Sequence, residues 1–149
     1  MALRERIDTE LTEARRRRDE VALRTLGLLK SELVKAGKEP GAGELNDEMV
    51  LRVIRREVKR RQEAAEAFAA GGRQDAVRDE EAEAELLRGY LPAEIGDDEL
   101  EREVHSVVSE LGASSPRDMG AVMKAATARL AGRAEPGRIA GVARRLLAG

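Results

Sequence analysis

The sequence predicts an all-α protein, with an N-terminal unit of four helices followed by a small C-terminal bundle of three helices. Apolar residues recur every three or four positions along most of the chain, which is the period of an amphipathic helix. The 149 residues are 42% apolar and 38% charged, with one Phe, one Tyr and no Trp, a composition typical of solvent-exposed helices. No segment shows the alternation of apolar and polar residues that indicates a strand.

Four helices are expected in an N-terminal domain of residues 1–92. Asp19 and Asn46 each stand where a side-chain oxygen can cap the free N–H groups of a first helical turn. A Gly-Gly pair favours the end of the third helix, and Pro92 stops the fourth. The expected helices cover about residues 2–17, 19–37, 46–70 and 75–89.

Three shorter helices are expected in a C-terminal domain of residues 96–149, after a linker at residues 92–96. Ser115 and Asp118 have the spacing of a capping box at the start of the sixth helix, with Pro116 at its first position. Glycine closes the fifth and sixth helices, and proline opens the seventh. The boundary residues in chain order are Gly112, Ser115, Gly132 and Pro136.

Charge is distributed unevenly along the chain. Residues 112–149 contain seven Lys or Arg and two Asp or Glu, a balance of +5, whereas residues 1–111 contain 20 and 27, a balance of −7. A positive helical module on an otherwise acidic protein suits a polyanion such as RNA. The alternative is a C-terminal helical domain with an ordinary solvated basic face.

Most catalytic and targeting signals are absent from the sequence. There is no Cys, no glycine-rich nucleotide loop and a single histidine, His105, which is expected on the surface. We therefore expect no catalytic site, no metal site and no cofactor. No apolar run approaches the length of about 20 residues that a membrane helix needs, and the N-terminus lacks a signal-peptide hydrophobic region. A cytoplasmic protein without a membrane partner is expected.

The third helix carries cationic residues spaced i, i+3, i+4, i+7 and i+8, opposite its apolar face. Guanidinium groups bind phosphate oxygens through paired N–H donors, so this basic stripe is a second candidate surface for a polyanion. The alternative is a helix face held to the acidic fourth helix by ion pairs. Glu57 and Arg61, on the apolar side, are expected to pair one turn apart at the edge of the core. The basic stripe comprises Arg52, Arg55, Arg56, Lys59 and Arg60.

The C-terminal domain holds the first candidate surface for RNA. Gly120 and Gly141 lie inside predicted helices, where glycine most often permits close helix packing and less often lets a nucleic acid approach. The amino end of the sixth helix, near Ser115 and Arg117, can present free N–H groups to a phosphate. The candidate RNA-binding residues are Arg117, Lys124, Arg129, Arg133, Arg144 and Arg145.

Residues 115–124 (SPRDMGAVMK), followed by residues 132–134 (GRA) and Ile139, resemble the C-terminal motif of the YqeY family. The resemblance extends over nearly the whole chain, and residues 90–92 (YLP) are among its most specific parts. Ala121 and Ala140 depart from it, because Lys and Asn are common there. The further matching runs are residues 24–26, 45–53, 58–61 and 70–75.

The resemblance implies an all-α protein with a larger N-terminal and a smaller C-terminal domain. The latter is similar to the tail of GatB, the B subunit of the glutamine-dependent tRNA amidotransferase, and that tail grips tRNA. The implied function is tRNA binding without catalysis. One alternative is an adaptor that docks a tRNA synthetase or an amidotransferase. Another is an amidotransferase-like carbon–nitrogen ligase with glutamine as amido donor, although the chain is too short to contain either catalytic domain of that enzyme.

Overall fold

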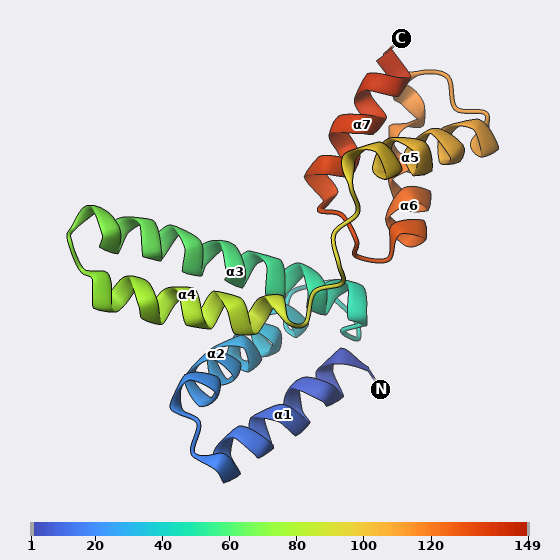
Figure 1. Cartoon of the computed structure of the whole chain (residues 1–149). Coiled ribbons are helices and arrows are strands. Elements are labelled where there is room, and N and C mark those ends of the chain that lie inside the picture. Colours follow the sequence, from blue (N-terminus) through green and yellow to red (C-terminus); the bar gives the residue numbers. More distant parts are fainter. Residues whose placement is uncertain (1, 149) are drawn as a thin grey trace. The chain divides into compact units, whose positions relative to one another are not determined.

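The computed structural model describes residues 2–148, and every regular element among them is helical (Figure 1). This confirms the predicted all-α class. The chain divides into two compact units, one ending at Leu91 and the other beginning at Pro92. Within residues 2–148, no helix combines the length and hydropathy needed to cross a membrane.

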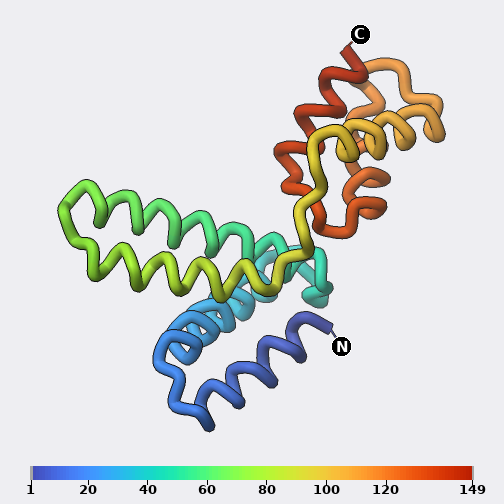
Figure 2. The backbone as a smooth tube through the Cα atoms, in the orientation of Figure 1, coloured from blue at the N-terminus to red at the C-terminus, as the bar shows by residue number. Residues whose placement is uncertain are grey.

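The N-terminal unit consists of four helices, of which α3 and α4 form a long antiparallel hairpin (Figure 2). Asp19 accepts a hydrogen bond from the N–H of Ala22 at 3.1 Å, and Asn46 accepts one from Met49 at 3.0 Å. Both predicted caps are therefore confirmed. The helices are α1 (Leu3–Arg17), α2 (Glu20–Gly37), α3 (Asp47–Ala70) and α4 (Gln74–Arg88).

The apolar stripes of α1, α2 and α3 meet in one core, in which Ile7, Leu26 and Ile54 are almost completely buried. Tyr90, just beyond α4, is also buried against this core. Its hydroxyl group donates a hydrogen bond to Glu10, and the Arg6 guanidinium lies 4.7 Å from the centre of its ring. Tyr90 thereby ties the end of α4 to α1.

The C-terminal unit is a three-helix bundle in which each α-helix packs against the other two. The sixth predicted helix begins with a separate 3-10 turn, η1, and the capping box formed by Ser115 and Asp118 is present there. Gly112, which closes α5, has a φ of 64°, a conformation that glycine adopts without strain. The elements are α5 (Asp97–Leu111), η1 (Pro116–Asp118), α6 (Met119–Leu130) and α7 (Pro136–Ala148).

The expected linker at residues 92–96 is not wholly a linker. Ile95 is only 3% exposed and belongs to the second core. Its backbone N–H donates to the carbonyl of Arg133 at 2.8 Å. This apolar residue is buried because the segment pairs with the turn between α6 and α7, a contact distant in sequence.

Candidate nucleic-acid interface

The C-terminal bundle separates its charges between helices. Helix α5 carries six Asp or Glu and one Arg, whereas the chain after it carries the balance of +5 noted above. Residues 96–149 together contain eight acidic and eight basic side chains. The expectation of a net positive module is therefore wrong for the folded bundle, because α5 is part of it. The bundle is instead acidic on one helix and basic on the other two.

Half of the candidate RNA-binding residues are engaged by α5 carboxylates. Arg129 pairs with Glu110, Arg133 with Glu99 at 3.1 Å, and Arg145 with Glu101 at 2.9 Å. All these carboxylates are substantially exposed, so each pair contributes at most about 1 kcal/mol to stability. Arg138 makes a further pair of this kind with Asp97, at 2.8 Å.

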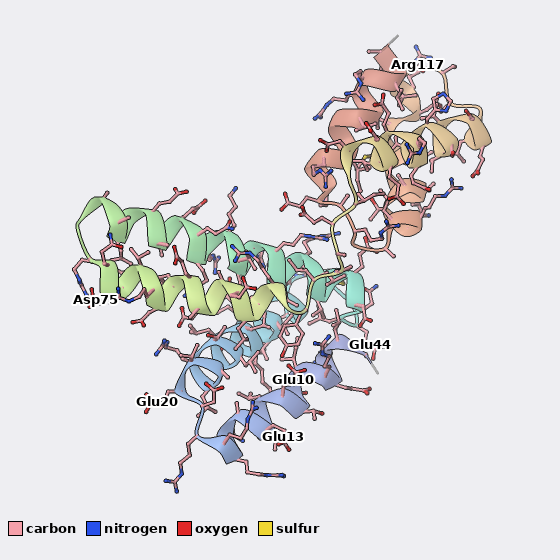
Figure 3. All side chains as sticks on the ribbon, viewed as in Figure 1. Glu10, Glu13, Glu20, Glu44, Asp75 and Arg117 are labelled. Carbon is pink, nitrogen blue, oxygen red and sulfur yellow. The ribbon has the colours of Figure 1, made fainter. Side chains whose placement is uncertain are left out.

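The other three candidates, Arg117, Lys124 and Arg144, are exposed, and their side chains form no ion pair with any residue from 2 to 148. They come from η1, α6 and α7, and η1 packs against α6 and α7 but not against α5. In Figure 3, Arg117 lies beside the C-terminal end of α7. We call these three residues the α6–α7 face.

Helical geometry separates the α6–α7 face from the paired residues. Arg138 and Arg145 both contact α5, and they lie on one side of α7. Arg144 is turned by about 100° from Arg145 around the helix axis, away from that side. On α7 the cations on the side of α5 are therefore paired with carboxylates, whereas Arg144 is not.

The amino end of the sixth helix does not leave its N–H groups available. The backbone N–H groups of Ser114 and Ser115 donate to the carboxylate of Asp118 at 2.9 and 3.2 Å. The N–H of Arg117 donates to the hydroxyl of Ser115 at 3.3 Å. The expectation of a phosphate site at these N–H groups is wrong, because the capping box already satisfies them.

The helical glycines of the bundle are not explained by close helix packing. A Cβ atom placed on Gly120, Gly137 or Gly141 would meet no atom within 4 Å beyond its chain neighbours and the backbone of its own helix turn. Glycine inside a helix costs about 1 kcal/mol relative to alanine, so the fold gains nothing from it here. These positions leave the backbone of α6 and α7 open to an approaching molecule.

On α3, four members of the basic stripe are exposed and Arg55 is half-buried. Arg60 pairs with Glu57 at 2.8 Å, and the Arg52 contact with Glu48 is long, at 3.8 Å. Arg56 and Lys59 form no ion pair within the described chain.

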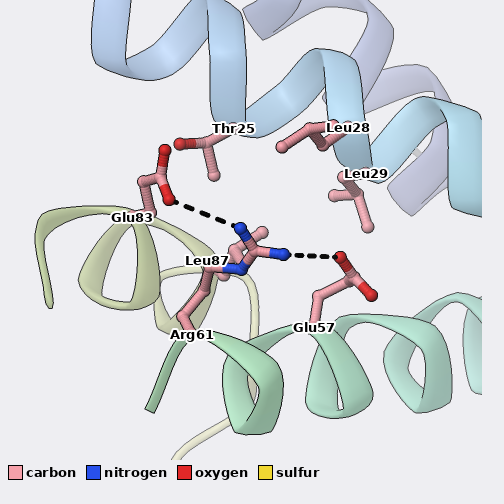
Figure 4. Close-up of a pocket in the computed structure, with 7 residues that line it drawn as sticks. All are labelled: Thr25, Leu28, Leu29, Glu57, Arg61, Glu83 and Leu87. Atoms are coloured by element: carbon pink, nitrogen blue, oxygen red, sulfur yellow. Dashed lines mark ion pairs between the residues drawn. The ribbon is translucent and has the colours of Figure 1, made fainter. Parts of the chain in front are cut away.

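Arg61, on the apolar side of α3, forms ion pairs with α4. Its guanidinium lies 3.6 Å from Glu57, 3.6 Å from Glu83 and 3.7 Å from Glu80. Figure 4 shows Arg61 between Glu57 and Glu83, in a small pocket bounded by α2, α3 and α4. The predicted pairing of Glu57 with Arg61 is confirmed, and Arg24 adds a 2.6 Å hydrogen bond to Glu83.

Sequence reasoning missed the role of Glu83, because the run DEEAEAE reads as uniformly acidic and exposed. The position of Glu83 relative to the apolar residues of α4 indicates its burial. Glu83 stands seven residues after Ala76 and four before Leu87, which places it on the buried side of α4. A carboxylate in that position requires a cationic partner, and Arg61 and Arg24 provide the charge.

Replacing Glu80 with glutamine is expected to raise the free energy of unfolding at neutral pH. Burial, and then the nearby Glu83 carboxylate, raise the pKa of Glu80 above its ordinary value of 4.5. The folded protein therefore holds this proton more tightly than the unfolded chain does, so ionised Glu80 opposes folding. Thermal unfolding should show the gain at about pH 7 and none at about pH 4, where the carboxyl group is largely protonated in both states. Glu81→Gln, at the exposed neighbouring position, should show no gain.

His105 is exposed on α5, as expected from its position. Among residues 2–148 no group of three or more His, Cys, Asp or Glu side chains is arranged to hold a metal ion.

Comparison with known proteins agrees with the resemblance in the motifs. The model of the family described as Yqey-like protein matches residues 4–147. The chain is also similar to Altered inheritance of mitochondria protein 41, mitochondrial, of Pyrenophora tritici-repentis (strain Pt-1C-BFP). The two are 27% identical over 132 residues, which cover 87% of this chain and 71% of the fungal protein. Because the family match spans almost the whole sequence, the chain belongs to the YqeY-like family.

Proposed function

We propose that the C-terminal unit binds the sugar–phosphate backbone of tRNA through the α6–α7 face, without carrying out chemistry on it. The observation that carries this proposal is the placement of Arg117, Lys124 and Arg144. They are exposed cations without ion-pair partners in the described chain, on η1, α6 and α7, and none of them contacts an α5 carboxylate within residues 2–148. Contacts of this kind recognise charge and shape more than sequence.

The surroundings of the α6–α7 face support a backbone ligand. The exposed glycines on α6 and α7 carry no side chain above the helix backbone, so a phosphate can approach that backbone closely. The carboxylates of α5 repel a polyanion, so only one side of the bundle is suitable. The similarity of this region to the tRNA-gripping tail of the amidotransferase B subunit favours tRNA among RNAs. A synthetase or amidotransferase partner and a cytoplasmic location stay predictions.

The test replaces the three residues of the α6–α7 face together, as Arg117→Gln, Lys124→Gln and Arg144→Gln, in the full chain. Glutamine has nearly the helix propensity of Arg and Lys, so the fold should be retained. Binding of fluorescent total tRNA, measured by anisotropy at several salt concentrations, should weaken about tenfold at about 100 mM salt. The logarithm of the association constant decreases as the logarithm of the salt concentration increases. This negative slope should become shallower by about 2 to 3, because up to three phosphate contacts are lost.

A matched control makes the same change in charge elsewhere. Arg4, Arg78 and Arg102 are exposed and form no ion pair within residues 2–148. Their joint replacement by glutamine should change tRNA affinity far less than replacement of the α6–α7 face. Equal losses in both variants would indicate a response to net charge alone, and an unchanged affinity in the first variant would remove the proposed site.

A further inference from the structure

A second cationic surface lies in the N-terminal unit and crosses two helices. Lys35 of α2 stands close to the basic stripe of α3, because both contact the same carboxylate. Glu32 lies 3.2 Å from Lys35 and 3.7 Å from Arg60. We call this surface the α2–α3 patch; its exposed cations are Lys35, Arg52, Arg56, Lys59 and Arg60.

Glu32 is surrounded by more positive charge than it can neutralise. Its side chain is only 19% exposed, although it comes from a surface helix. The pKa of Glu32 is lowered, first by the hydrogen bond from Lys35 and then by the charges of Lys35, Arg60 and Arg56. One carboxylate therefore faces cations from two helices, and the patch keeps a net positive charge.

The remaining acidic groups compensate this charge only in part, because Glu57 contacts Arg60 at 2.8 Å but no other cation of the patch. The carboxylates of α4 that contact α3 are held by Arg61, about 180° around the helix from Arg52. Arg56 and Lys59 have no ion-pair partner within residues 2–148, and the Arg52–Glu48 contact is long, at 3.8 Å. The alternative of a stripe held to α4 by ion pairs does not account for these three side chains.

The composition of the patch indicates what kind of ligand it fits. Three of its five cations are arginines, whose guanidinium groups bind phosphate oxygens through paired N–H donors. Protein interfaces instead need buried apolar or aromatic anchors and are depleted in lysine. The exposed large apolar residues of the described chain are Leu28, Val34 and Leu111. Leu28 and Val34 lie on α2, but none of the three lies on α3, which supplies four of the five cations.

We propose that the α2–α3 patch is a second binding surface for nucleic-acid backbone, which engages the same RNA as the α6–α7 face. This inference rests on the proposed function. From Arg52 to Lys59 the patch extends about 10 Å along α3, at 1.5 Å per residue. Because both surfaces belong to one chain, engagement of the first makes engagement of the second an intramolecular step.

The test uses the full chain with Arg56→Gln and Lys59→Gln together, chosen because neither side chain forms an ion pair within residues 2–148. Affinity for fluorescent total tRNA should fall about five- to tenfold. The negative slope of the logarithm of the association constant against the logarithm of salt concentration should become shallower by about 1.4 to 1.8. The control replaces Arg4 and Arg78 by glutamine, which removes the same charge from the same unit at exposed positions on α1 and α4. It should leave the slope nearly unchanged.

The outcomes separate this inference from the proposed function. If Arg56→Gln/Lys59→Gln binds tRNA like the parent chain, or loses no more than its control, the α2–α3 patch is not an RNA surface. The role of the α6–α7 face is then decided by the variant that replaces its own three residues. If the α6–α7 variant keeps full affinity while the patch variant loses it, the proposed function fails and the patch alone binds RNA. Equal melting curves for the parent and both variants would confirm that the fold is unchanged.

Discussion

Replacing Arg61 with leucine is expected to lower the free energy of unfolding of the N-terminal unit by about 3 kcal/mol. The side chains of Glu57 and Glu83 are each only 4% exposed, and Arg61 is the cation that contacts both. Its removal leaves two desolvated carboxylates without the charge between them. Arg60 and Arg24 still contact these carboxylates. We therefore expect a loss at the lower end of the range of about 3–5 kcal/mol that is typical of a broken buried ion pair. Urea unfolding followed by circular dichroism measures it.

Two companion variants identify the cause of that loss. Arg78→Leu changes an exposed arginine of the neighbouring helix and should alter stability by no more than about 0.5 kcal/mol. Adding Glu57→Gln and Glu83→Gln to Arg61→Leu should recover part of the loss, because the uncompensated charges are then removed together. A loss that persists unchanged in the triple variant would show that Arg61 acts through packing and not through charge.

Neutralising the α5 carboxylates that hold α6 and α7 cations is expected to strengthen tRNA binding about tenfold. Glu99→Gln, Glu101→Gln and Glu110→Gln together release Arg133, Arg145 and Arg129. A phosphate must otherwise displace each carboxylate, at a cost of about 0.2–1 kcal/mol per exposed pair, and 1.4 kcal/mol corresponds to a factor of ten. The salt dependence should also steepen by about 2, because three more cations become available. Anisotropy titrations over a range of salt concentrations measure both effects.

The chain offers a control with the same change in charge. Asp98, Glu103 and Glu135 belong to the same unit, and their side chains form no ion pair among residues 2–148. Asp98→Asn, Glu103→Gln and Glu135→Gln reduce the overall repulsion of RNA but release no cation. If this control gains as much affinity as the first triple variant, the α5 ion pairs do not compete with RNA.

The features that the sequence predicted correctly depend on residues close together along the chain. Asp19 and Asn46 cap helices through N–H groups only three residues away, and Glu57 meets Arg61 within one helical turn. The pairing of α5 with Arg129, Arg133 and Arg145 joins residues 19 to 44 positions apart, such as Glu110 and Arg129. Periodicity gives the direction of a side chain on its own helix but not which helix it meets. The division of the basic residues into paired and unpaired sets therefore required the packed bundle.

The separation of acidic and basic helices within the C-terminal unit gives it an electric dipole at nearly zero net charge. The field of a polyanion extends over a Debye length of about 8 to 10 Å at physiological salt, and it exerts a torque on such a dipole before contact. Such a torque favours orientations in which α5 points away from the strand during diffusion. Productive encounters become more frequent without a high overall charge, and the association rate constant should rise as ionic strength falls.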